Sequence, residues 1–90
     1  MENLKERGQR VEGVAAAIEQ ERERQRNLPL DMQMEMFAAG KLFMDSESSE
    51  DIAQRYVNGE GSDRLDWHLR VADPGYEPAD DFERRYQDAV

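Results

Sequence analysis

The hydrophobic pattern of residues 31–44, "DMQMEMFAAGKLFM", contrasts with the strongly polar sequence around it. This segment holds four of the five methionines of the chain. At about 100° per residue, its apolar side chains point in three directions around a helix. A helix that is apolar on nearly every side is normally buried. We therefore expect a central helix over residues 30–44 that the other elements surround.

The N-terminal segment, residues 3–26, predicts a long polar helix because it is rich in the strong helix formers Ala, Glu, Arg and Gln. Its large apolar residues are few, and the stripe that includes Val11 and Ile18 fails at Gln25. The end of this segment, "EQERERQR", is polar on every side, so we expect it to project into water.

The rest of the chain predicts short helices separated by turns. Ser48 is placed to cap a helix that ends near Gly59. Residues 63–72 alternate as a strand would but also form a helical face, and the lack of a pairing strand favours a helix. Asp-Pro-Gly then predicts a turn, and acids followed by bases predict a last helix over residues 79–89.

These elements together predict an all-α fold. A chain of 90 residues makes one domain, residues 1–90. We expect a small helical domain with a long N-terminal helix, a buried central helix and two or three short C-terminal helices. Residues 1–27 would form the long polar helix, and residues 28–90 the compact acidic helical part.

The charge of the chain is unevenly distributed. The formal net charge is −9; residues 1–30 carry six acids and six bases, whereas residues 31–90 carry fifteen acids and six bases. This excess opposes direct binding of nucleic acid or anionic membranes and favours a basic protein partner. The chain has no cysteine, no apolar run long enough for a membrane span and no signal-peptide pattern, so we expect a cytoplasmic protein.

We find no pattern that predicts a catalytic, cofactor-binding or metal site, and we expect no enzyme. His68 is the only histidine, and no second catalytic group is spaced to help it, so we expect a satisfied surface or boundary residue. Asp45 and Glu47 alternate as calcium ligands do. However, the sixth position of that loop is Glu50 instead of Gly, and the twelfth is Tyr56 instead of Glu.

The function that the sequence favours is association with another protein. We expect a small acidic regulator or inhibitor that docks on a basic surface of a larger protein and can imitate the charge of nucleic acid. That partner could be a nucleic-acid-binding enzyme. The acids that would contact the partner are Asp45, Glu47, Glu50, Asp51, Asp80, Asp81 and Glu83.

Two alternatives remain open. The first is a homo-oligomeric structural or assembly module, with a homodimer completing the cover of the central helix. The residues expected at its interface are Val11, Ile18, Met32, Met36 and Phe43. The second is an antitoxin-like protein that neutralises a partner by wrapping it with residues 73–90, which would then be mobile in the free protein.

Overall fold

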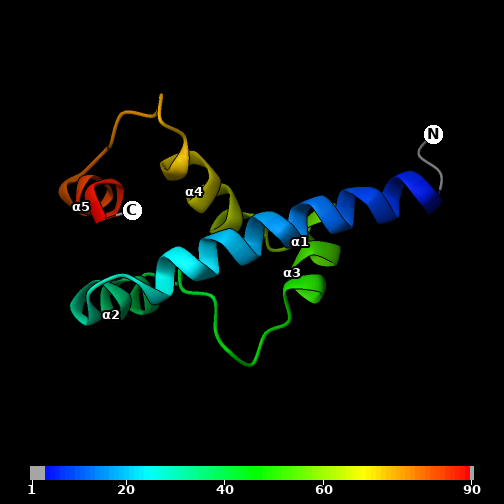
Figure 1. Ribbon diagram of the computed structural model, residues 1–90, viewed down its shortest axis with the longest axis horizontal. Coiled ribbons are helices and arrows are strands. Elements are labelled where there is room, and N and C mark those ends of the chain that lie inside the picture. Colours follow the sequence, from blue (N-terminus) through cyan, green and yellow to red (C-terminus); the bar gives the residue numbers. More distant parts are fainter. Residues whose placement is uncertain (1–3, 90) are drawn as a thin grey trace.

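The structure, a computed structural model, describes residues 4–89 and confirms the all-α expectation. Residue 3 of the expected first helix and residue 90 lie outside the described residues. Residues 63–72, whose sequence pattern fitted both a strand and a helix, are helical. The helices are α1 (Leu4–Arg26), α2 (Leu30–Ala38), α3 (Ser49–Val57), α4 (Ser62–Ala72) and α5 (Asp81–Ala89) (Figure 1).

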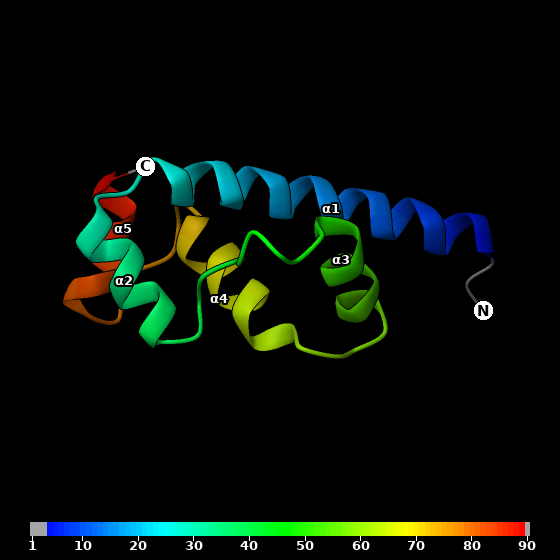
Figure 2. The ribbon, with the colours of Figure 1, turned by 90° about the horizontal axis from the view of Figure 1, so that it is seen from below.

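The long helix α1 runs along one side of the molecule, and the four short helices all lie on the same side of α1 (Figure 2). The principal extents are 42 × 30 × 19 Å. Helix α3 packs against the N-terminal half of α1, whereas α2 and α5 lie near its C-terminal end (Figures 1 and 2). This arrangement leaves the first turns of α1 extending beyond α3.

The prediction that the polar C-terminal end of α1 projects into water is wrong. Residues 5–10 are exposed instead, while Glu21 and Gln25 are buried. Ile18, Glu21, Gln25 and Leu28 follow a 3-4-3 spacing and so share one face of the helix. The buried stripe of α1 therefore continues through two polar residues, whose side chains find partners inside the protein.

The prediction that the second helix reaches residue 44 is also wrong, because α2 ends at Ala38. Gly40 has φ 73°, a left-handed conformation that glycine adopts without steric cost. The Lys41 amide donates to the Met36 carbonyl at 2.8 Å, and the Gly40 amide donates to the Phe37 carbonyl at 3.1 Å. These two bonds make a Schellman motif, which satisfies the last carbonyls of a helix and stops it.

Residues 41–44 instead form no regular secondary structure, and side chains from α1 and α4 bond to their backbone. The amide group of Gln25 both donates to the Phe43 carbonyl and accepts from the Phe43 amide, each at 2.9 Å. Arginines donate to the two flanking carbonyls, Arg64 to Leu42 at 3.1 Å and Arg22 to Met44 at 3.2 Å. The two hydrogen bonds between Gln25 and Phe43 thus account both for the burial of Gln25 and for the position of residues 41–44 beside α1.

The apolar core consists of two clusters. The first cluster, near α2 and α5, contains Leu28, Met32, Met36, Trp67, Val71 and Tyr86. The second, between α1 and α3, contains Ile18, Phe43, Ile52, Ala53 and Leu65. Glu21, Gln25, His68 and Glu83 are the buried polar residues among the described side chains.

Two helix termini follow their sequence signals. The Ser48 hydroxyl accepts from the Asp51 amide at 3.2 Å, which confirms the predicted N-cap of α3. Gly59, with φ 83°, follows the end of α3 as expected. Helix α5 begins at Asp81, two residues later than predicted, and the Asp80 carboxylate accepts from the Glu83 amide at 2.8 Å.

Candidate protein-interaction surface

A buried polar network joins α1, α4 and α5 at the centre of the molecule. His68 Nδ1 lies 3.1 Å from Glu21 Oε1, and the Tyr86 hydroxyl donates to the same oxygen at 2.9 Å. The other ring nitrogen of His68, Nε2, lies 2.6 Å from the Lys41 carbonyl. His68 has no exposed surface, which corrects the expectation of a surface or boundary residue.

The protonation of this network follows from its partners. Burial alone would raise the pKa of Glu21, but hydrogen bonds from His68 and Tyr86, together with nearby positive charge, hold it below its usual range. Burial, with the adjacent Glu21 carboxylate, raises the pKa of Tyr86, so its hydroxyl keeps its proton and donates. The Lys41 carbonyl oxygen can only accept, so Nε2 of His68 donates to it.

This network holds three helices together and has no access for a substrate. Glu21 and His68 are separated by 47 residues in the chain, and both side chains are almost wholly enclosed. Every buried nitrogen or oxygen of the described side chains has a hydrogen-bond partner. The network is therefore a satisfied part of the core, which stabilises one arrangement of the helices.

Glu83, one of the acids expected to bind a partner, lies inside the protein. Its carboxylate accepts from Trp67 Nε1 at 3.0 Å, from the Tyr76 hydroxyl at 2.7 Å and from the Ala79 amide at 2.8 Å. Burial opposes ionisation of Glu83, but these bonds outweigh it and lower its pKa. Glu83 is thus occupied in joining α4 to α5 and does not face an incoming protein.

Glu47 is also engaged within the chain. Arg64 donates to both carboxylate oxygens of Glu47, at 3.0 and 2.7 Å, and Arg55 lies 3.8 Å away. The hydrogen bonds from Arg64 are the main reason that the pKa of Glu47 is lowered. The Arg64 guanidinium also lies over the Phe43 ring, 4.6 Å from its centroid. These contacts of Arg64 hold the loop before α3 against α4.

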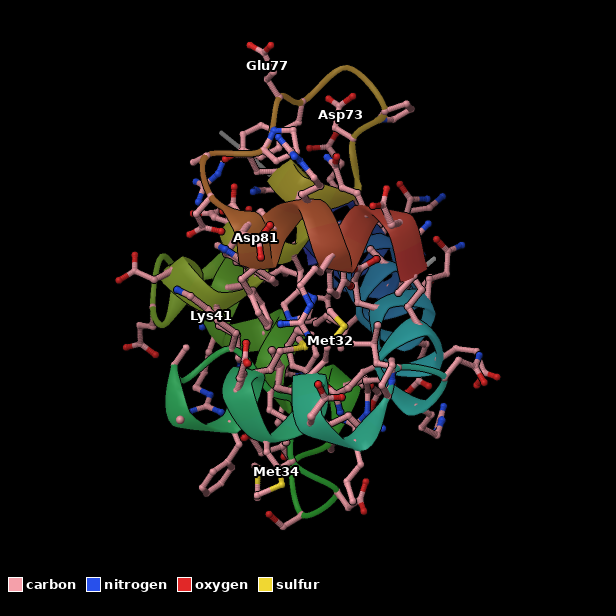
Figure 3. All side chains as sticks on the ribbon, turned by 90° about the vertical axis from the view of Figure 1, so that its left-hand side faces the viewer. Met32, Met34, Lys41, Asp73, Glu77 and Asp81 are labelled. Atoms are coloured by element: carbon pink, nitrogen blue, oxygen red, sulfur yellow. The ribbon has the colours of Figure 1, made fainter. Side chains whose placement is uncertain are left out.

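The other expected partner-binding acids are exposed, but they form two separate groups. Asp45, Glu50 and Asp51 lie in the loop before α3 and in its first turn, while Asp80 and Asp81 lie at the start of α5. Figure 3 shows Asp81 on the outer side of α5. None of the five forms an ion pair within residues 4–89. These five acids therefore form two exposed acidic groups that can face a partner.

The bases of the acidic part are mostly occupied by internal contacts. Besides Arg55 and Arg64, Arg85 pairs with Asp31 at 3.0 Å and with Glu35 at 3.6 Å. Arg70 lies over the ring of Tyr76. The fold therefore directs several bases towards its own acids, carbonyls and rings, while many acids remain directed outward.

Four residues expected in self-association are buried within a single chain. Ile18, Met32, Met36 and Phe43 are each no more than 4% exposed, and Val11 is half-buried against the second cluster. Met32 lies between α2 and α5, whereas Met34 points away from the molecule on the other side of α2 (Figure 3). The central helix is thus covered on one side only.

The uncovered side of α2 carries large apolar side chains. Leu30, Met34 and Phe37 are 71%, 65% and 60% exposed. They border a hollow of about 520 Å³, which Gln33, Ala38 and Leu42 also line. We call Leu30, Met34, Phe37, Ala38 and Leu42 the α2 patch. Exposed apolar groups that gather in this way mark interaction sites more often than single exposed residues do.

A second hollow adjoins the α2 patch at Ala38. It has a volume of about 530 Å³ and lies between the C-terminal end of α2 and the start of α5. Its apolar lining includes Ala39, Trp67 and Phe82, and its acids include Glu35 and Asp80. The surface around α2 therefore combines apolar side chains with carboxylates at its edge.

Neither a metal site nor a membrane span is present in the described part of the chain. No group of three or more histidine, aspartate or glutamate residues within residues 4–89 is arranged to hold a metal ion. None of the described helices is both long and apolar enough to cross a membrane.

The sequence contained a signal for the buried polar residues of α1. The spacing of Ile18, Glu21, Gln25 and Leu28 continues the earlier apolar stripe. The buried face of α1 could therefore have been predicted to extend through the two polar positions. Nothing local identified His68 as the partner of Glu21 or the Phe43 backbone as the partner of Gln25, and nothing local showed which side of α2 the rest of the chain covers.

Comparison with other proteins adds no further information about this surface. The chain matches no protein-family model, and no curated protein or solved structure shows significant similarity to it.

Proposed function

We propose that this protein is a small acidic regulator or inhibitor that binds a larger protein through a basic surface of that partner. The observation that carries the proposal is the division of charge in the folded chain. Arg55, Arg64, Arg70 and Arg85 contact groups of their own chain, whereas Asp45, Asp51 and Asp81 remain exposed and unpaired within residues 4–89.

An outward negative field steers association with a positively charged partner and disfavours acidic partners. A basic groove that normally accepts nucleic acid is one surface of this kind, so competition with nucleic acid is a natural way for the protein to inhibit. The cytoplasmic location expected from the lack of cysteine remains a prediction.

The test is capture of a partner from a native extract on the immobilised protein, followed by binding measurements at increasing salt concentration. We expect the affinity to fall as salt rises, since screening weakens attraction between exposed charges. An affinity that does not depend on salt would contradict electrostatic docking.

A matched pair of variants locates the charge that matters. Asp45→Asn with Asp81→Asn removes one exposed acid from each acidic group, and we expect it to weaken binding and to reduce the salt dependence. Glu12→Gln with Glu23→Gln removes the same charge from exposed positions of the charge-balanced N-terminal helix. Equal effects of the two pairs would show that only total charge matters.

A homo-oligomeric assembly module is the second candidate, and the α2 patch is the observation that favours it. Because Met32 and Met36 are buried in one chain, an interface between copies would use Leu30, Met34 and Phe37 instead. Sedimentation over a concentration series tests this candidate. A protein that stays monomeric at micromolar concentration would exclude it.

The antitoxin-like alternative receives less support from the fold. It expected residues 73–90 to be mobile in the free protein, with residue 90 outside the described residues. Within that segment, Tyr86 is fully buried in the first core cluster, and Glu83 bonds to Trp67. A wrapping mechanism would have to detach these contacts before binding.

A further inference from the structure

We propose that the α2 patch is the docking surface for a basic amphipathic helix of the partner protein. The inference rests on the proposed function and deepens it, since it names the surface and the chemical character of the segment that binds there. Three observations carry it: the spacing of the exposed apolar residues, the acids beside them, and the area that they offer.

The exposed apolar residues of α2 have the spacing of a helix-packing ridge. Leu30, Met34 and Phe37 stand at positions i, i+4 and i+7 and so lie along one side of the helix. The hollow lined by Gln33, Ala38 and Leu42 runs beside this ridge. Helices pack by placing the ridge of one into the groove of the other, so a second helix is the shape that fits.

The carboxylates next to the patch select a basic helix. Asp31 and Glu35 lie on α2 between the patch and α5, and both side chains are more than half exposed. Their partner, Arg85, is itself 40% exposed. Exposed ion pairs of this kind contribute little stability, so an incoming Lys or Arg can exchange with Arg85 at small cost.

The available area disfavours a second copy of this chain as the occupant. Three large side chains exposed to this extent offer on the order of 400 Å² of surface. Stable interfaces bury about 800 Å² on each partner, so the patch alone is too small for a stable homodimer. Two chains of net charge −9 would also repel each other, whereas a basic partner gains attraction over a wider area.

The experiment uses the full-length protein and a fluorescent synthetic peptide as the probe. The peptide has about 14 residues of leucine, alanine and lysine, with its leucines on one helical face. A scrambled peptide of the same composition has the same charge but no apolar face. Fluorescence anisotropy measures the dissociation constant of each peptide. The emission of the single tryptophan, Trp67, which lines the adjoining hollow, is recorded as a second readout.

We expect the unmodified protein to bind the amphipathic peptide about tenfold more tightly than the scrambled peptide. Met34→Ser with Phe37→Ser should abolish this preference without a change of charge. Because both residues are exposed, circular dichroism should show an intact fold. Leu69→Ser is the matched control, since Leu69 is exposed on α4 outside the patch, and it should keep the preference.

The remaining outcomes separate this inference from the proposed function. Equal binding of both peptides that weakens with salt would overturn the α2 patch as the site while leaving electrostatic docking in place. No binding of either peptide at low salt would count against both. A dimer in sedimentation that the Met34 and Phe37 substitutions dissolve would make a second copy the occupant and would also overturn the inference.

Discussion

Two regions of this protein depart from the usual distribution of residues, in opposite directions. At the junction of α1, α4 and α5, the charged and polar side chains of Glu21 and His68 are buried. On the outer side of α2, the apolar side chains of Leu30, Met34 and Phe37 are in water. Buried polar groups and exposed apolar patches are the two observations about burial that carry information.

The difference between the two regions lies in whether their groups have partners. Glu21 accepts hydrogen bonds from His68 and Tyr86, so the interior region is complete within one chain. The side chains of Leu30, Met34 and Phe37 in the α2 patch have no such cover in the described part of the chain. A satisfied buried network stabilises the fold, whereas an uncovered apolar surface is available to another molecule.

The largest expected effect is the loss of Glu21. Glu21→Ala removes the acceptor of His68 and Tyr86 inside the protein, and breaking a buried pair in this way costs about 3–5 kcal/mol. Urea denaturation measures the change. Glu23→Ala, two residues away at an exposed position, should remain within about 0.5 kcal/mol of the original protein. Similar values for both variants would show that the interior network does not stabilise the fold.

The two sides of α2 should respond differently to the same substitution. Met36 is fully buried, so Met36→Ala leaves a cavity and should cost about 2–5 kcal/mol. Met34→Ala, on the exposed side, should change the free energy of unfolding by no more than about 0.5 kcal/mol. A large loss of unfolding free energy in Met34→Ala would mean that the α2 patch is covered in solution. If that loss depended on protein concentration, the cover would be a second copy of the chain.

Acid should destabilise the fold through three carboxylates that are bonded within the chain. The folded-state pKa values of Glu21, Glu47 and Glu83 lie below the ordinary value of 4.5. The stabilisation from these groups is therefore complete above that pH and is lost as the pH falls through their folded values. Thermal melts between about pH 7 and pH 3 measure this loss. In the Glu21→Ala variant the same pH change should lower the stability less, and an unchanged pH dependence would contradict the assignment.

Removal of a hydrogen bond at the surface should lower the free energy of unfolding less than removal of the buried ones. Ser48→Ala removes the hydroxyl that accepts from the Asp51 amide, and the loss of such a cap costs about 1 kcal/mol. Thermal melts compare this variant with Ser46→Ala, a change at an exposed position nearby in the same loop. A loss as large as that of Glu21→Ala would show that burial does not distinguish the two kinds of hydrogen bond.

Local signals in the sequence determined much of the helical structure. The composition of residues 3–26 predicted α1, Ser48 and Gly59 predicted the limits of α3, and the acids-then-bases order predicted α5. These features depend on residues close together in the chain, so they can be recognised without knowledge of the fold. Gly40 was also a local signal, and its left-handed conformation ends α2 before the apolar pattern does.

The tertiary structure decided which polar residues are inside and which apolar residues are outside. Glu21 and Gln25 are buried because His68 and the Phe43 backbone come from distant parts of the chain to satisfy them. Met32 is covered and Met34 is not because α5 lies on only one side of α2 (Figure 3). The sequence by itself determined most of the helical structure and the negative charge. The partners of the buried polar residues and the uncovered side of α2 follow from packing between distant segments, which no local pattern encodes.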